Sequence, residues 1–170
     1  MPTRKSLGAR LRRIKMLLLD VDGVLTDGGL YYSAQGVELK RFHAHDGYGV
    51  VRAFEQGLKI GLISGRTTPV VTARAAALGI DDVIQGMQDK VTAMRSLQEK
   101  YHFQDEEFAF MGDELFDMPL LRTVGFAAAP RNARPEVLRI VQYVTRAAGG
   151  EGAAREVIDL ILAHRQRRKS

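Results

Sequence analysis

Two carboxylates directly follow a short apolar run near the start of the chain. In the segment MLLLDVDGVLTDG, residues 16–28, Asp20 and Asp22 stand one residue apart and Gly23 comes next. Aspartate and glycine form strands poorly, and a carboxylate at the end of a buried strand is costly unless it is paired or binds a metal. Taken alone, the pattern is more typical of a simple turn. Its meaning depends on what other elements bring to the same place.

Three more polar residues follow apolar runs later in the chain. Ser64 ends the run GLIS, Asp113 ends FAFMGD, and Lys90 comes after the short run DVIQG. Individually, Ser64 is explained by a helix cap and Lys90 by a solvated surface position. Together they predict one site, provided that their strands lie in one sheet.

The elements that must position these residues alternate between strands and helices. Strands that are apolar throughout and alternate with helices are typical of a parallel sheet covered by helices on both faces. The expected strands are 16–19, 58–64, 82–86, 108–113, 126–130 and 143–145, the helices 46–57, 69–79, 90–102, 118–125, 135–141 and 153–165, with a hairpin at 30–42. Ligands bind such sheets beyond the carboxyl ends of the strands, where the polar residues above would converge.

Composition limits the class of protein. The chain has 170 residues, of which 45% are hydrophobic and 26% charged, and it has no cysteine. The absence of thiols fits a reducing compartment, and the early apolar run is too short for a signal peptide or a membrane span. We expect a cytoplasmic protein of one domain, residues 1–170, with a basic segment at 1–13, a hairpin flap at 28–42 and a C-terminal helix and tail at 149–170.

The net charge of +5 is concentrated at the two ends, in RKSLGARLRRIK and HRQRRKS. Solvated terminal runs are the common explanation of such charge, and the sequence lacks the interleaved aromatic residues of single-strand binders. We expect neither a nucleic-acid nor a membrane partner. A positive field would instead favour a small anionic substrate.

The predicted cluster suits phosphoryl transfer with a magnesium ion. Asp20 and Asp113 supply carboxylates, and Mg²⁺ prefers oxygen ligands, commonly one or two carboxylates with a substrate phosphate. Lys90 is a point charge for phosphate, while Ser64 and the backbone of Gly65 can donate hydrogen bonds to its oxygens. A cation, an ammonium and hydrogen-bond donors around a carboxylate nucleophile are what this reaction needs.

The same residues, in this order, resemble the four motifs of the haloacid dehalogenase superfamily. DVDGV is similar to the first motif, Ser64 and Lys90 occupy the second and third, and GDELFD carries the fourth with Asp113 and Asp117. The resemblance implies a haloacid dehalogenase-like α/β fold, a Rossmann-like parallel sheet sandwiched by helices. It also implies that a cap domain is lacking and that a β-hairpin is inserted after the first strand.

The superfamily resemblance implies a role for each residue. Asp20 would attack phosphorus and form a phosphoaspartyl intermediate, and Asp22 would protonate the leaving alcohol and then activate water. Asp20, the main-chain carbonyl of Asp22, and Asp113 would hold Mg²⁺. Lys90 and Ser64 would neutralise the transferring phosphoryl group.

Longer segments resemble one family in particular, the 3-deoxy-D-manno-octulosonate 8-phosphate phosphatases, a small uncapped branch. The segments are DVDGVLTDG, LKRFHAHDGYG, LISGR, QGMQDK, GDELFDMP and YVTRAAGGEGAAREV, and the resemblance covers residues 15–162. It implies an anionic sugar acid phosphate as substrate, in lipopolysaccharide precursor synthesis. It also implies a homotetramer built by the hairpin, in which neighbouring subunits and the tail after GGEGA help close each site. The substrate contacts that it implies are Ser64, Gly65, Lys90, Arg66, Arg74 and the run His43, Ala44, His45, Asp46 and Gly47.

The chain departs from this family at three positions. Several relatives are basic where this chain has His45 and Val51, and Glu114 replaces the usual aspartate after Asp113. Glu114 keeps the charge, and we expect it to lie with Asp117 just outside the ligands of the metal. Within the enzyme class, the alternative is a phosphatase of a nonulosonate (sialic-acid-like) 9-phosphate.

Two other classes of protein share part of this pattern. A signalling receiver domain also places Asp, Lys and Ser/Thr on a parallel sheet with Mg²⁺, but its phosphoacceptor lies on a middle strand, and VIQG has no Asp there. An inactive sugar-phosphate-binding scaffold on the same fold would have lost Asp20 or Asp22, and both are present. The residues therefore favour the phosphatase.

The glycine-rich segment GGEGAAR, residues 149–155, superficially resembles a dinucleotide-binding loop. The βαβ unit that such a loop needs has no room to follow it. We therefore expect a flexible hinge and the start of a helix there.

Overall fold

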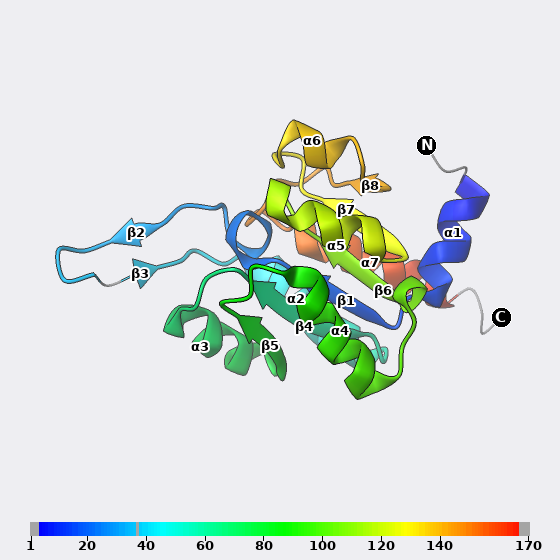
Figure 1. The fold of residues 1–170 in the computed structure, drawn as a ribbon, viewed down its shortest axis with the longest axis horizontal. Coiled ribbons are helices and arrows are strands. Elements are labelled where there is room, and N and C mark those ends of the chain that lie inside the picture. Colours follow the sequence, from blue (N-terminus) through cyan, green and yellow to red (C-terminus); the bar gives the residue numbers. More distant parts are fainter. Residues whose placement is uncertain (1–3, 37, 167–170) are drawn as a thin grey trace.

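The computed structural model describes residues 4–36 and 38–166 and is a three-layer α/β fold (Figure 1). A six-stranded sheet in the order β5-β4-β1-β6-β7-β8 forms the middle layer, and all its neighbouring strands run parallel. The strands are β1 Met16–Leu19, β4 Lys59–Ser64, β5 Asp82–Gln85, β6 Phe108–Met111, β7 Phe126–Ala129 and β8 Tyr143–Val144. The helices are α1 Arg4–Arg13, α2 Ala44–Glu55, α3 Pro69–Leu78, α4 Lys90–Tyr101, α5 Met118–Thr123, α6 Pro135–Leu138 and α7 Ala153–Gln166. The expected parallel α/β sheet is confirmed.

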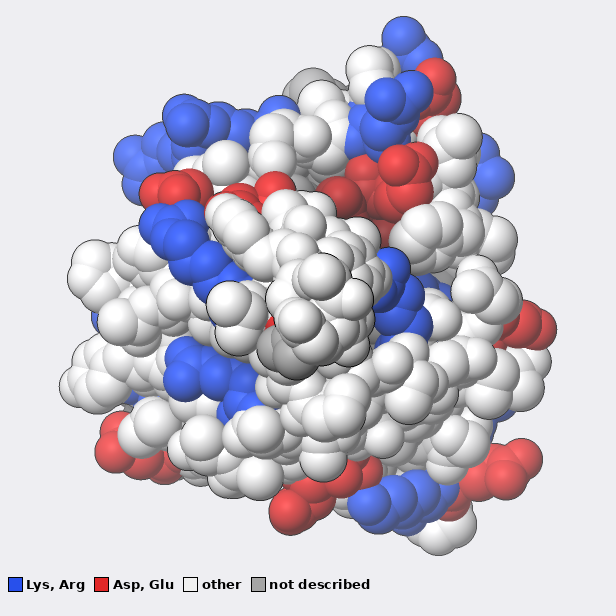
Figure 2. Space-filling model, turned by 90° about the vertical axis from the view of Figure 1, so that its left-hand side faces the viewer, with Lys and Arg blue, Asp and Glu red and all other residues white. Residues whose placement is uncertain are grey.

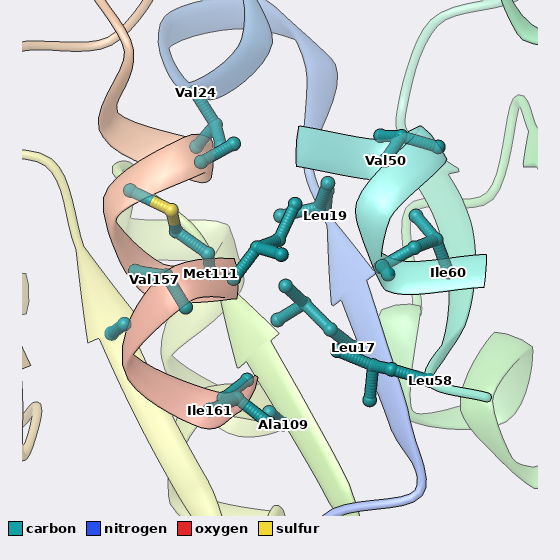
Figure 3. Close-up of a cluster of buried hydrophobic side chains, with 14 of the residues drawn as sticks. Leu17, Leu19, Val24, Val50, Leu58, Ile60, Ala109, Met111, Val157 and Ile161 are labelled. Atoms are coloured by element: carbon teal, nitrogen blue, oxygen red, sulfur yellow. The ribbon is translucent and has the colours of Figure 1, made fainter. Parts of the chain in front are cut away.

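Burial on both faces explains why strand β1 is apolar throughout. Its side chains alternate between a core that α1, α2, α3 and α7 cover and a core that α4, α5 and α6 cover, and all of them are buried. Figure 3 shows Leu17 and Leu19 packed between α2 and α7. A strand enclosed in this way has little freedom to move. It is a firm base for Asp20, which directly follows it.

Local signals set where the helices begin and end. Helix α3 begins at Pro69 and ends before Gly79, whose φ of +69° closes it, as expected. Helix α2 begins two residues before the expected start, because the His43 side chain accepts a hydrogen bond from the His45 backbone at 3.2 Å and caps the helix. Helix α6 stops after one turn, so the helix expected over 135–141 is too long.

The expected hairpin is present and stands apart from the main sheet. Strands β2 Tyr31–Tyr32 and β3 Glu38–Leu39 pair antiparallel in a sheet of their own, which projects from the molecule in Figure 1. Its apolar side chains are exposed, with 54% for Tyr31, 58% for Tyr32 and 64% for Leu39. A cluster of large exposed apolar side chains is typical of an interaction surface.

Helix α1 is an element that the sequence analysis missed. The basic residues at 1–13 predict a solvated run, but α1 packs against α7, and Leu11 and Ile14 are buried. The helical spacing of Leu7, Leu11 and Ile14 was the available signal. Residues 1–3 and 167–170 of the two basic ends lie outside the described residues. Within the described part of the chain, no helix is long and apolar enough to cross a membrane.

Candidate active site

The carboxyl ends of the central strands open into a cavity of about 320 Å³. Asp20 follows β1, Ser64 ends β4 and Asp113 follows β6, so the polar strand ends meet at one edge as expected. Figure 2 shows acidic and basic side chains side by side around the projecting hairpin. The cavity is lined by Asp20, Asp22, Gly23, Gly28, Leu30, Ser64, Gly65, Arg66, Gln88, Asp113, Glu114 and Phe116.

Asp20 is fixed by contacts on both its backbone and its side chain. Its N–H donates to the Met111 carbonyl at 3.0 Å, which continues the pairing of β1 and β6 beyond the strand end. Its Oδ1 accepts a hydrogen bond from the Val21 N–H at 2.7 Å, and its Oδ2 lies 3.0 Å from Lys90 Nζ. Asp20 is 3% exposed. The carboxylate is therefore held at the floor of the cavity.

Gly23 lets the following turn approach the third carboxylate. The turn spans Val21–Leu25, and Gly23 has a φ of +85°, which favours glycine. A Cβ atom at Gly23 would lie 2.1 Å from Asp113 Oδ2. No other residue fits there while Asp113 keeps its place.

Lys90 and Asp117 form a buried pair behind the cavity. Lys90 Nζ donates to Asp117 Oδ1 at 2.6 Å, and both side chains are almost completely covered. Asp117 Oδ2 accepts hydrogen bonds from the N–H groups of Asp113 at 2.9 Å and Glu114 at 3.1 Å. Asp117 therefore orients the loop that carries Asp113, and Lys90 reaches Asp20 from behind.

The carboxylates at this edge suit a hard divalent cation. One oxygen each of Asp20, Asp113 and Asp117 lies within 4.8 Å of the others. Asp113 Oδ1 is buried and has no hydrogen-bond partner among the described residues, which leaves it available to a ligand. Both oxygens of Asp117 already accept hydrogen bonds, so Asp20 and Asp113 are the better ligands. Carboxylate oxygens in this arrangement are the donors that Mg²⁺ prefers.

The protonation equilibria reflect the same crowding of acids. Burial, followed by the nearby charges of Asp20 and Asp117, raises the pKa of Asp113 to about 8. Burial also raises the pKa of Asp20 to about 7, although the Lys90 ammonium opposes the shift. A bound cation would favour the ionised form of both carboxyl groups.

The hairpin reaches the cavity through a network of charged side chains. Lys40 Nζ contacts the Asp22 carboxylate and lies 2.8 Å from Glu38 Oε1. Arg66 donates to the Tyr32 hydroxyl, lies 3.4 Å from Glu38, and its Nε is 3.8 Å from Asp22 Oδ2. The hydrogen bond from Lys40 lowers the pKa of Glu38. Lys40, Glu38 and Tyr32 were not among the expected site residues.

The side chain of Asp22 faces away from that of Asp20 after the strand. Its side chain is 24% exposed and faces Lys40 and Arg66, whereas Asp20 faces Lys90. Ser64 is buried, and its Oγ accepts a hydrogen bond from the Arg66 backbone at 3.2 Å. The hydroxyl of Ser64 is thereby kept at the edge of the cavity.

Comparison with known proteins agrees with this geometry. A family model of haloacid dehalogenase-like hydrolases matches residues 79–157. The 3-deoxy-D-manno-octulosonate 8-phosphate phosphatase of Escherichia coli strain B is 42% identical over 161 residues, which are 95% of this chain and 86% of that protein. The chain belongs to the 3-deoxy-D-manno-octulosonate 8-phosphate phosphatase family.

Solved structures of this family have the same fold. The Yersinia pestis phosphatase superposes with a TM-score of 0.94 at 38% identity, over 99% of this chain and 91% of that one. The Moraxella catarrhalis phosphatase, in complex with a magnesium ion, a phosphate ion and a KDO molecule, gives a TM-score of 0.94 at 34% identity, over 98% of this chain and 96% of that one. The family fold expected from the sequence is therefore confirmed.

Several residues that the family resemblance implied as substrate contacts do not line the cavity of their own chain. These are Arg74, the run 43–47 and Lys90, whose ammonium lies 3.0 Å from Asp20 Oδ2. Asp46 is buried and accepts hydrogen bonds from the N–H groups of Gly152 at 3.3 Å and Arg155 at 2.8 Å, so it caps helix α7. Arg74 Nε is buried without a hydrogen-bond partner in the described part of the chain. Within one subunit, these residues are structural or point elsewhere.

The glycine pair before α7 is tightly packed. The flexible hinge that the sequence predicts at this segment is therefore not found. Gly149 and Gly150 lie against the turn of the first motif, where the Gly150 N–H donates to the Val24 carbonyl at 3.0 Å. A Cβ atom at Gly149 would lie 1.8 Å from the Gly23 carbonyl oxygen. Glycine is therefore required here for close approach of two backbones, and this contact ties the last helix to the catalytic turn.

Replacing Asp113 by Asn tests the metal site. The raised pKa of Asp113 means that, without metal, the folded protein holds this proton more tightly than the unfolded chain does. The free energy of unfolding should therefore fall as the pH rises from about 4 to about 8. Asp113→Asn should raise the melting temperature without metal and abolish the stabilisation by Mg²⁺, which is about 2.7 kcal/mol at 100 times Kd. Thermal unfolding with and without Mg²⁺ measures both effects. Glu114→Gln is the control and should keep the Mg²⁺ response; an unchanged response in Asp113→Asn would contradict the assignment.

Replacing Gly149 by Ala tests the contact between the two backbones. The added methyl group should displace the Val21–Leu25 turn, lower the free energy of unfolding by about 1–3 kcal/mol and weaken Mg²⁺ binding. Gly152→Ala is the matched control, since a Cβ atom there meets nothing within 4 Å, although its φ of +96° adds strain. Chemical unfolding and Mg²⁺ titration compare the two variants. Equal Mg²⁺ affinities would show that the contact does not position the turn.

Proposed function

We propose that this chain is a magnesium-dependent phosphatase that hydrolyses 3-deoxy-D-manno-octulosonate 8-phosphate to the free sugar acid and phosphate. The observation that carries the proposal is the buried Asp20 carboxylate, which faces both the cavity and Lys90 and lies close to Asp113. Family membership and the KDO molecule bound by the Moraxella catarrhalis relative support the substrate. We place the reaction in the cytoplasm, in the synthesis of lipopolysaccharide precursors.

Asp20 is the nucleophile of the proposed reaction. Its carboxylate attacks phosphorus, the bond from phosphorus to the sugar oxygen breaks, and a phosphoaspartyl intermediate forms on Asp20. Water then attacks this intermediate and releases phosphate. Ser64 lines the cavity beside the reacting group, and Lys90 contacts Asp20 from behind it. A hydroxyl and an ammonium in these places stabilise the negative charge of the transferring phosphoryl group.

Asp22 moves the protons of both steps. It donates a proton to the leaving sugar oxygen and then removes one from the attacking water, so each turnover restores its starting state. Its position at the cavity edge, beside Asp20 in sequence but facing the hairpin, suits this role.

Mg²⁺ would be held by the carboxylates of Asp20 and Asp113 and by the main-chain carbonyl of Asp22. When bound, it supplies the positive charge that lets an anionic phosphate approach two carboxylates. Glu114 and Asp117 lie just outside these ligands, and Asp117 keeps the Asp113 loop in place through its two amide hydrogen bonds.

Amide substitutions at the two motif carboxylates test the chemistry. Asp20→Asn should abolish turnover, and Asp22→Asn should lower kcat/KM for an alkyl phosphate on the order of a hundredfold or more. Asp27→Asn, an exposed residue of the same segment, is the control and should keep the wild-type rate. Phosphate release measures all three; a near-normal rate for Asp20→Asn would rule out the covalent mechanism.

A substrate panel tests the sugar acid. Arg66 lines the cavity and its side chain is 42% exposed, so its guanidinium can form a bidentate ion pair with the substrate carboxylate. Arg66→Ala should lower kcat/KM for 3-deoxy-D-manno-octulosonate 8-phosphate by roughly tenfold to a hundredfold and that for an aryl phosphate much less. Arg122→Ala, on the exposed side of α5, is the control. A tenfold preference for a nonulosonate 9-phosphate would make the alternative substrate the correct one.

We further propose that the single domain of residues 1–170 works as a homotetramer. The exposed apolar hairpin favours burial against other subunits, and a neighbour would bring Arg74, His43, Ala44 and His45 to a site that their own chain does not supply. Asp46 and Gly47 are buried in their own chain, where Asp46 caps α7, so they are left out of this proposal. Helix α7 packs into the core of its own chain, so residues 153–166 do not form the tail over an adjacent cavity that the family resemblance implied.

Mixed assembly tests this arrangement. We expect Asp20→Asn and Arg74→Ala subunits to be inactive or weak alone and to regain activity when they are unfolded and refolded together. An Arg74→Ala subunit keeps an intact Asp20, and a neighbouring Asp20→Asn subunit can supply the missing Arg74 to its cavity. Sedimentation should show tetramers in every sample. A fully active monomer, or mixtures no more active than the sum of their parts, would contradict shared sites.

A further inference from the structure

Lys40 is a buried lysine that no step of the proposed mechanism uses. It directly follows β3, where the hairpin returns to the body of the molecule, and its side chain is 0% exposed. Its Nζ contacts Asp22 Oδ1 and lies 2.8 Å from Glu38 Oε1. Lysine is almost never fully covered unless it is paired, and here one partner is the proton donor of the reaction.

Asp22 is held between two cations that come from different elements. Lys40 engages Oδ1, and Arg66 Nε lies 3.8 Å from Oδ2. The Arg66 side chain is 42% exposed and lines the cavity, whereas Lys40 is shielded from solvent. The contact with Lys40 is therefore the firmer constraint, because solvent does not compete for it.

This arrangement decides which oxygen of Asp22 can face the leaving group. Oδ1 is engaged by the Lys40 ammonium, so Oδ2 is the oxygen left to exchange a proton with the leaving group. With Oδ1 fixed, the direction in which Oδ2 faces is fixed as well. A carboxyl group prepared in this way loses less entropy when it aligns with the leaving oxygen.

We propose that Lys40 is a positioning residue that orients Asp22 for proton transfer to the leaving oxygen. The inference rests on the proposed function, since it concerns the proton donor of that reaction. In the step, the bond from phosphorus to the leaving oxygen breaks, a bond from phosphorus to Asp20 forms, and the proton of Asp22 Oδ2 moves to the leaving oxygen. Lys40 keeps its own protons and acts through Asp22 alone.

A purely mechanical role is the competing explanation. Lys40 also contacts Glu38, which lies 3.4 Å from Arg66, so its loss could displace the hairpin and slow every substrate alike. Leaving groups separate the two roles. An alkoxide is a poor leaving group and needs the proton, whereas p-nitrophenolate departs readily without one.

The experiment measures kcat/KM of the Mg²⁺-loaded full chain on a series of alkyl, phenyl and p-nitrophenyl phosphates. Lys40→Met should cost on the order of a hundredfold for alkyl esters and little for p-nitrophenyl phosphate, so that the rate depends more steeply on the leaving group. In an Asp22→Asn background, Lys40→Met should cause no further change, because both substitutions remove the same proton transfer.

Arg41→Met is the matched control, since Arg41 is the next residue, is exposed and pairs with Glu151 at 2.9 Å, away from the cavity lining. It should leave the whole series unchanged. Lys40→Arg keeps the charge and should recover part of the alkyl rate. If Lys40→Met does not fold, the double variant Lys40→Met/Glu38→Gln serves in its place. It removes the charge of Glu38, which Lys40→Met leaves without its lysine partner.

Equal losses on all esters, or a further loss in the Asp22→Asn background, would overturn the proposal for Lys40. The series contains no sugar acid, so a steeper leaving-group dependence supports the role of Lys40 even if another phosphate ester is the natural substrate. Absence of activity in the wild-type protein both on every ester and on 3-deoxy-D-manno-octulosonate 8-phosphate would instead overturn the proposed function, and this inference with it.

Discussion

The Lys90 ammonium, buried between the carboxylates of Asp20 and Asp117, is the contact on which the rest of the site depends. Lys90 begins α4, Asp20 follows β1 and Asp117 precedes α5, so one ammonium joins three elements that are far apart in sequence. Losing one partner of such a buried pair costs about 3–5 kcal/mol, because it leaves a charge without compensation. The place of the nucleophile is therefore set by the fold itself, through the strand behind it and the lysine beneath it.

Charge balance at the same edge explains why a divalent cation fits. Asp20, Asp113 and Asp117 bring three carboxylates together, and Lys90 supplies one positive charge. Two negative charges are left over, which is the charge that one divalent cation neutralises. The raised pKa of Asp113 expresses this imbalance, since a buried acid among other acids holds its proton until a cation replaces it.

The carboxylates at the floor of the cavity, and Arg66 and Glu114 at its sides, were predictable from the sequence, whereas its contacts with the hairpin were not. Asp20, Ser64 and Asp113 follow apolar strands, and the ends of parallel strands meet at one edge whatever the loops do. The roles of Lys40 and Glu38 were not predictable, because their partners depend on how the hairpin folds back, and no local sequence pattern indicates this. The capping of α7 by Asp46 and the approach of Gly149 to Gly23 were missed for the same reason, since each joins segments more than a hundred residues apart.

Among the described residues, the hairpin pairs with no strand of the six-stranded sheet. Its apolar side chains are open to solvent in the single chain, and its base ends on Lys40. Substitutions in the hairpin therefore escape the packing demands within the chain that confine β1 between two cores. They are constrained instead by the proposed contacts between subunits, so variation of the hairpin can change what approaches the cavity at small cost to the stability of the single chain. The residues at the floor of the cavity would stay the same. Substrate specificity and catalytic chemistry can therefore change at different rates within one small domain.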